Sequence, residues 1–108
     1  GRLKNTMTLS SIRHTRLLDK KVKKVAICGG SGSFLLRPAI AEGADFLVTA
    51  DFKYHEFFDA DGKIMIADIG HYESEIYTKE LIVGILKEKF PTFAVNFSTT
   101  DTNPVRYL

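Results

Sequence analysis

VAICGGSGS, residues 25–33, is the stretch that most constrains the fold of this chain. Its first half, Val25 to Cys28, is a continuous apolar run, and a run without polar alternation predicts a strand covered on both faces. The second half is a cluster of glycine and serine that ends the strand. Residues 34–42 then show a helical pattern ending at Gly43, a residue suited to a left-handed helix cap, while Pro38 restricts where that helix begins.

The same alternation of apolar strand and helix continues along the chain. Further strands are expected at 45–49, 64–67 and 93–97, and helices at 53–60 and 71–90. A weaker alternation over 8–15 predicts a short edge strand, and residues 1–7 are expected to be either frayed or a connection to an upstream segment. Elements in this order imply right-handed crossovers, so the expected fold class is α/β: a layered, largely parallel sheet with helices on both faces.

Length and composition indicate a single α/β domain, residues 1–108. The 108 residues are 44% hydrophobic and 26% charged, which is ordinary for a folded domain with one modest core. A net charge of +2 gives no reason to expect a nucleic-acid surface. The single cysteine, Cys28, excludes an internal disulfide framework, and no apolar stretch approaches the roughly 20 residues of a membrane span. Because no signal-peptide pattern opens the sequence, a cytoplasmic location is expected.

Candidate ligands gather in three segments that follow strands, at 29–33, 49–55 and 68–75. In parallel sheets the functional crevice lies beyond the carboxyl ends of the strands. In the third segment His71 and Glu75 are spaced to share one face of a helix, where an imidazole and a carboxylate can bind zinc, iron or manganese. Spacing alone leaves the alternative open that both residues only sit near a helix N-terminus.

The second segment repeats this spacing with Asp51 and His55. Asp51 directly follows a strand and could be a metal ligand, a partner of a ligand or a general base, but capping of the next helix would also explain it. Tyr54 and Tyr72 each neighbour a candidate ligand and could hydrogen-bond a substrate, although packing would explain them equally well.

The first segment could bind an anion through backbone N–H groups at the start of a helix. The residues expected in this loop are Gly29, Gly30, Ser31 and Gly32. The loop partly resembles a dinucleotide fingerprint, but its third glycine position is Leu35, and no Gly-Lys-Ser/Thr follows. The pattern therefore favours a general phosphate site over a specific dinucleotide.

Together, the three segments resemble the Nif-three-like dinuclear metal-centre family, whose members are often labelled GTP cyclohydrolase 1 type 2 homologues. The resemblance extends from about Ile12 to Pro104. It implies that His71 and Glu75 bind metal and that Asp51 and His55 line the same cleft, although Ala50 stands where the family usually has glycine. The family's other ligands, a His-His pair and an aspartate, lie in an N-terminal half that nothing here matches. The resemblance thus implies the C-terminal half of a two-part Nif-three-like fold.

Cofactor and partners are also expected from this resemblance. The full-length parent would bind two divalent metal ions (zinc, iron or manganese), whereas these 108 residues would be metal-free or partly loaded. The expected partners are the missing N-terminal half of its own chain, further copies in a homo-oligomer (a hexamer in the family) and a small-molecule substrate, with no membrane and no nucleic acid. The expected function is metal-dependent hydrolysis in the parent, with the isolated fragment inactive. The alternative is a metal-binding protein-interaction module without turnover.

Overall fold

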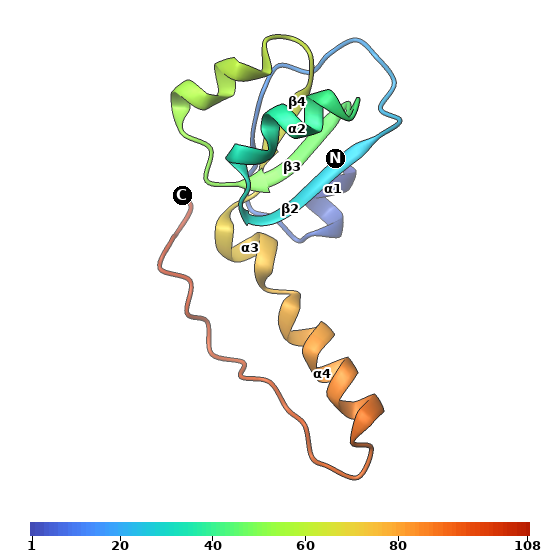
Figure 1. Ribbon diagram of the computed structural model, residues 1–108. Helices are drawn as coiled ribbons and strands as arrows, with labels where there is room; N and C mark the ends of the chain where they lie inside the picture. The colour runs from blue at the N-terminus through green and yellow to red at the C-terminus, as the bar shows by residue number, and fades with distance from the viewer.

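The computed structural model describes residues 1–108 and contains one four-stranded sheet with strand order β1-β4-β3-β2 (Figure 1). Strands β2 (Val25–Ser31), β3 (Phe46–Ala50) and β4 (Met65–Asp68) run parallel, and the short strand β1 (Arg13–His14) pairs antiparallel with β4. The parallel strands start in register, because Phe46 lies between Val25 and Met65. The predicted largely parallel α/β sheet is therefore confirmed, and its strand ends meet at one edge.

Helices cover both faces of this sheet, as predicted. The helical elements are α1 (Arg2–Thr6), η1 (Ser33–Leu35), α2 (Leu36–Ala41), η2 (Tyr54–Ala60), α3 (His71–Glu75) and α4 (Thr78–Lys89). Successive residues of a strand point to opposite faces. Leu47 and Ile66 accordingly pack with α2 and η2, whereas Val48 and Ala67 pack with Leu9 on the face that α1 covers.

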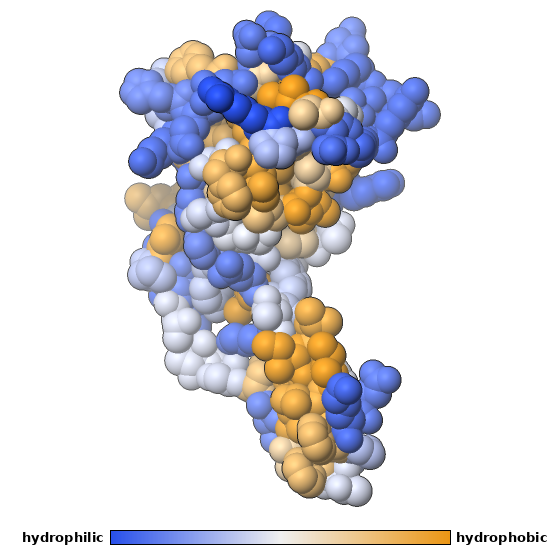
Figure 2. Space-filling model, in the orientation of Figure 1, coloured by the Kyte–Doolittle hydropathy of each residue, from blue (hydrophilic) through white to orange (hydrophobic).

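Strand β2 differs from the prediction that it is covered on both faces. It forms one edge of the sheet, and Val25 and Ile27 are 47% and 77% exposed. Only the opposite side of the strand, which carries Ala26, packs against the core under α2. The prediction was wrong because an apolar run shows that side chains favour burial without showing what covers them. Figure 2 shows apolar side chains at the surface of the sheet domain and along α4.

The single helix expected over 71–90 is two helices. Helix α3 ends at Glu75 and α4 begins at Thr78. Between them, the Tyr77 hydroxyl donates a hydrogen bond to the carbonyl oxygen of Met7 at 2.8 Å. This contact with the N-terminal segment accompanies the break, which no glycine or proline in the sequence marks. Helix α4 projects away from the sheet and buries none of its residues (Figure 1). No helix of the chain has the length and apolar character to cross a membrane.

The two ends of the chain also differ from expectation. Residues 1–7 are not frayed, because Leu3 in α1 and Met7 pack against Leu9. The strand expected at 93–97 does not form, since no strand lies alongside with which it could pair. Residues 91–108 instead run back along α4 toward the sheet (Figure 1).

Candidate metal centre

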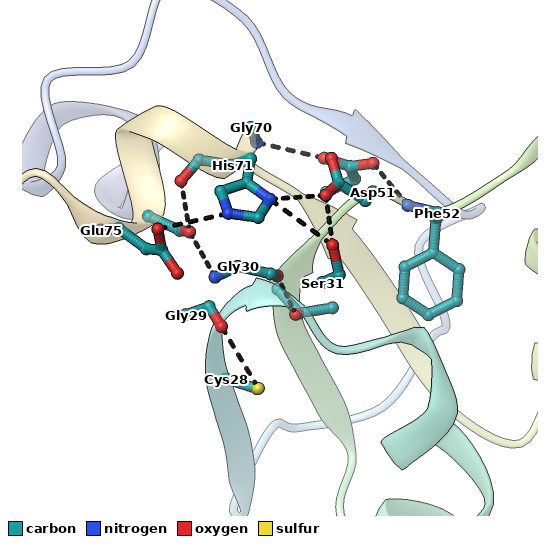
Figure 3. A network of polar contacts seen from close by, with 12 residues as sticks. Cys28, Gly29, Gly30, Ser31, Asp51, Phe52, Gly70, His71 and Glu75 are labelled. Atoms are coloured by element: carbon teal, nitrogen blue, oxygen red, sulfur yellow. Dashed lines mark hydrogen bonds and ion pairs between the residues drawn. The ribbon is translucent and has the colours of Figure 1, made fainter.

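Three turns meet at the carboxyl ends of β2, β3 and β4 and bring predicted site residues together (Figure 3). Ser31 ends β2, Asp51 follows β3, and His71 begins α3 just after β4. Because the three strands are parallel and adjacent, residues that are 20 and 40 positions apart come into contact here.

The His71 imidazole is held between two carboxylates. Its Nδ1 lies 2.6 Å from Asp51 Oδ2, and its Nε2 lies 3.2 Å from Glu75 Oε2. The Ser31 hydroxyl donates a hydrogen bond to the same Asp51 oxygen. The hydrogen bond to Asp51 and the charges of Asp51 and Glu75 raise the pKa of His71, while the bonds from His71 and Ser31 lower the pKa of Asp51. The site therefore favours positive charge on or beside the ring.

This arrangement decides which nitrogen of the ring is available. An ionised carboxylate can only accept hydrogen bonds, so Nδ1 carries the hydrogen that Asp51 accepts. In the neutral ring Nε2 then presents a lone pair to the Glu75 oxygen 3.2 Å away, and two such electron-pair donors require a proton or a cation between them. Metal-ligating histidines are commonly oriented in this way, by a carboxylate that accepts a hydrogen bond from the ring nitrogen that does not bind the metal.

The spacing of the two donor atoms fits a divalent cation. Two ligand atoms at about 2.1 Å from one ion, with an angle of about 90–109° between them, lie roughly 3.0–3.4 Å apart. The 3.2 Å between His71 Nε2 and Glu75 Oε2 falls in this range. No three His, Cys, Asp or Glu side chains of the chain are arranged to hold an ion. His71 and Glu75 would therefore supply two of the about four ligands that such an ion requires.

Gly30 leaves open the space that these ligands occupy. It has φ +69° and lies where the pairing of β2 with β3 changes register. A Cβ at this position would lie 2.6 Å from Glu75 Oε1 and 3.3 Å from His71 Nε2. The Gly30 N–H donates to Ser74 Oγ at 2.8 Å, and Ser74 Oγ donates to the carbonyl oxygen of His71 at 2.8 Å. These contacts tie the end of β2 to α3, and the close approach requires glycine.

A buried carboxylate lies behind the site. The Asp68 side chain at the end of β4 is 4% exposed and forms an ion pair with Arg13. It accepts hydrogen bonds from the Phe52 N–H at 3.0 Å and from the Gly70 N–H at 3.1 Å. Arg13 also donates to the carbonyl oxygen of Phe52 at 2.8 Å. The pair therefore contacts both the turn after β3 and the turn after β4.

A cavity of about 620 Å³ opens beside α3, with Asp51, His71 and Glu75 among its lining residues. Residues 91–108, the C-terminal tail, also line this cavity, through Asn103, Pro104, Val105 and Tyr107. The Asn103 side chain donates to a Glu73 carboxylate oxygen at 3.2 Å. Partial burial and the charge of Glu73 raise the pKa of Tyr107. The cavity has the volume of a small-molecule site.

The remaining predicted residues lie in different places. Tyr72 is half-buried and lines the cavity. His55 is exposed on η2, with its ring 5.3 Å from the ring of Tyr54, and is not a lining residue of the cavity. Asp51 and His55 do not share a helical face, because Asp51 has φ +58° and η2 begins only at Tyr54. Asp51 does not cap η2 either, since the N-cap residue is Lys53.

The loop predicted to bind an anion packs against α3. Of the residues expected there, Gly29, Gly30, Ser31 and Gly32, the Gly30 N–H already donates to Ser74, and the Asp51 carboxylate accepts from Ser31. Anion binding by this loop stays a prediction.

Sequence reasoning missed several residues that the structure brings to this site. Asp68 lay in the third predicted segment but was given no role, although a carboxylate that closes an apolar strand has to find partners in the interior. Arg13, Asn103 and Tyr107 carried no signal, since they reach the site from distant parts of the chain.

Comparison with known proteins decides the family. A family model described as Duf34/NIF3 (NGG1p interacting factor 3) matches residues 1–104. The chain belongs to the Duf34/NIF3 family. Two curated relatives named GTP cyclohydrolase 1 type 2 homolog, from Staphylococcus aureus (strain MSSA476) and Staphylococcus epidermidis (strain RP62A), are 35% and 37% identical over 111 and 112 residues. The matches cover 98% and 96% of this chain but 30% of each relative.

Solved structures of the Duf34/NIF3 family share the fold. The crystal structure of a Staphylococcus aureus hypothetical protein superposes with a TM-score of 0.88 at 32% identity, covering 98% of this chain and 37% of the other. A Bacillus cereus protein related to NIF3 gives a TM-score of 0.83 at 32% identity, covering 98% and 30%. The family predicted from the three sequence segments is thus confirmed, and this Duf34/NIF3 chain spans about 30% of the length of the curated relatives.

Proposed function

We propose that His71 and Glu75 are two ligands of a dinuclear divalent-metal centre, and that this chain is the C-terminal part of a metal-dependent hydrolase. One observation carries the proposal. His71 Nε2 and Glu75 Oε2 lie 3.2 Å apart, while Nδ1 of the same ring is engaged by Asp51 at 2.6 Å. The chain's own contacts therefore hold both donor atoms close enough to share one ion.

The remaining ligands would come from outside these residues. The resemblance assigns a His-His pair and an aspartate to an N-terminal half, and the curated relatives are more than three times as long as the segment that they share with this chain. Zinc, iron and manganese all accept a histidine nitrogen beside a carboxylate oxygen. The family resemblance supports a homo-oligomer, a hexamer, as the complete assembly.

Bound divalent ions would polarise a bond in the substrate and supply hydroxide near neutral pH. The chain's own residues would orient the ligands and shape the cavity. Asp51 fixes the tautomer of His71, and Arg13, Tyr72 and Tyr107 line the cavity of about 620 Å³. That volume suits a small substrate such as a nucleotide, a pterin-like ring or a phosphorylated small molecule. The name of the relatives, GTP cyclohydrolase 1 type 2 homolog, supports a nucleotide.

Metal analysis of the complete protein that contains this segment tests the ligand assignment. Mass spectrometry of purified protein should find about two divalent ions per chain, with His71→Ala and Glu75→Gln each losing metal. Glu73→Gln is the matched control, because Glu73 lies on the same helix but its carboxylate accepts from Asn103. Full metal content in His71→Ala and Glu75→Gln would refute the assignment. Calorimetry on the 108 residues alone should show weak or absent binding, and two tight sites there would contradict a split centre.

Turnover decides between hydrolysis and the alternative function. The metal-loaded complete protein should hydrolyse at least one member of a nucleotide panel, and His71→Ala should abolish that activity. The alternative, a metal-binding interaction module, is supported by the family description, which names an interacting factor. A metal-loaded protein that turns over no member of the panel would favour the module, and turnover unaffected by His71→Ala would place catalysis elsewhere.

A further inference from the structure

We propose that Asp68 is a positioning residue whose single buried carboxylate sets the contact between Asp51 and His71. The inference rests on the proposed function only in that the positioned histidine would bind metal; the contacts that carry it belong to the chain itself. Asp68 forms no hydrogen bond with the side chain of Asp51 or His71, so it acts through the backbone that presents them.

Each oxygen of this carboxylate accepts a backbone N–H from a different turn. Oδ2 accepts from the Phe52 N–H at 3.0 Å, and Phe52 directly follows Asp51. Oδ1 accepts from the Gly70 N–H at 3.1 Å, and Gly70 directly precedes His71. One side chain therefore holds the neighbour of both partners in the 2.6 Å contact between Asp51 and His71.

The turn after β3 is held through both backbone polar groups of Phe52. Arg13 Nη2 donates to the carbonyl oxygen of Phe52 at 2.8 Å while it also pairs with Asp68. The Phe52 side chain is 2% exposed and packs in the larger apolar cluster. Both polar groups of the Phe52 backbone and its ring are thereby fixed, which leaves the preceding residue little freedom.

The Asp51 turn has a backbone conformation that needs such support. Asp51 has φ +58°, a region that residues with a side chain rarely adopt, whereas Gly70 adopts φ +91° without that cost because it has no Cβ. Without the bonds from Asp68, the Asp51 turn would relax toward an ordinary conformation and carry its carboxylate away from Nδ1 of His71. A carboxylate with two accepting oxygens is required, because an amide in its place would set N–H donors against a backbone N–H.

Nuclear magnetic resonance of the chain in the presence of a chelator tests this inference. Long-range proton–nitrogen spectra of the imidazole at roughly pH 9, above the range in which an ordinary histidine is charged, report which ring nitrogen carries the hydrogen. In the unaltered chain we expect the Nδ1–H form of His71 to predominate. In Asp68→Asn we expect the ratio of Nδ1–H to Nε2–H to fall about tenfold or more, because the charge-assisted bond to Asp51 is lost.

The chain offers a closely matched control in Asp45. Its carboxylate also accepts two backbone N–H groups, from Lys23 and Lys24 at 2.9 Å each, and pairs with Lys20 at 3.3 Å. It directly precedes β3 and so lies at the amino ends of the parallel strands, away from the site at their carboxyl ends. Asp45→Asn should therefore leave the His71 tautomer unchanged while it perturbs the backbone to a similar extent.

The outcomes separate clearly. A changed tautomer in Asp68→Asn with an unchanged one in Asp45→Asn supports the role of Asp68, and an unchanged tautomer in Asp68→Asn overturns it. If Asp68→Asn fails to fold, Asp68→Glu decides, since it keeps the charge but moves the carboxylate by one methylene relative to the Phe52 and Gly70 N–H groups. In that variant a folded chain with a shifted tautomer supports the proposal, and an unshifted tautomer overturns it. Because chelator is present throughout, the result is independent of whether the complete protein binds metal.

Discussion

Replacement of Gly30 by alanine perturbs the candidate centre at the point where β2 passes closest to its ligands. The new Cβ would lie 2.6 Å from Glu75 Oε1, well inside contact distance. Because the Glu75 side chain is 52% exposed, it can move away into solvent, so the contact displaces the carboxylate rather than the strand. A retreat of roughly 1 Å restores ordinary contact and takes Glu75 Oε2 out of its position beside His71 Nε2.

Two effects of different size follow from that geometry. The backbone effect is the cost of holding alanine at φ +69°, about 1–2 kcal/mol of unfolding free energy. The effect on the site is the loss of one oriented ligand, which should weaken metal binding by the complete protein about tenfold or more. Urea unfolding of the chain measures the first, and a competitive chelator titration of the complete protein measures the second.

Gly43→Ala separates the two effects. Gly43 has φ +75°, and a Cβ there would meet no atom within 4 Å. It should lower the free energy of unfolding by a similar amount and leave metal affinity unchanged. Equal metal affinity in Gly30→Ala and Gly43→Ala would refute the reasoning, because Glu75 would then not depend on the space beside Gly30.

Three further predictions concern stability and the tail. Two backbone N–H groups lower the pKa of Asp45 to about 2, so the stability that they provide is complete above roughly pH 4 and is lost as pH falls through about 2. Asp45→Asn should therefore make the free energy of urea unfolding depend less on pH between about 4 and 2. An unchanged pH dependence would contradict this role of Asp45. Ile66 is 0% exposed, so Ile66→Ala should lower the free energy of unfolding by about 2–5 kcal/mol. Ile85 on α4 is 45% exposed, so Ile85→Ala should lower it by less than about 1 kcal/mol. Similar losses for the two variants in thermal or urea unfolding would contradict the burial of Ile66. Asn103→Ala removes the 3.2 Å bond to Glu73 and should speed limited proteolysis within residues 98–108, and an unchanged cleavage rate would show that this bond does not hold the tail.

The fold was predictable wherever a segment carries its own signal. The strands that include Val25, Phe46 and Met65 are apolar runs between breakers, and their order with helices implies the parallel sheet. Pairing, by contrast, is a property of two segments. The strand expected at 93–97 has the right composition but no neighbour, and the exposed side of β2 has the right composition but no cover.

The candidate site was predictable to a similar extent. Helical spacing indicated that His71 and Glu75 share a face, and their 3.2 Å separation agrees with it. The same argument linked Asp51 with His55, but the left-handed turn at Asp51 carries that carboxylate to His71 instead. No local pattern encodes that turn, because the bonds that hold it come from Asp68, which lies beyond the next helix.

The apolar side chains of α4 have a thermodynamic consequence of their own. Leu81, Ile82 and Ile85 are between 45% and 64% exposed. Water held against them is released when any apolar surface covers them, and that gain grows on warming from low temperature. Reversible clouding of a concentrated solution on warming, with the circular dichroism of the sheet intact and with less clouding in Leu81→Ser, would therefore report that this helix contributes to the association.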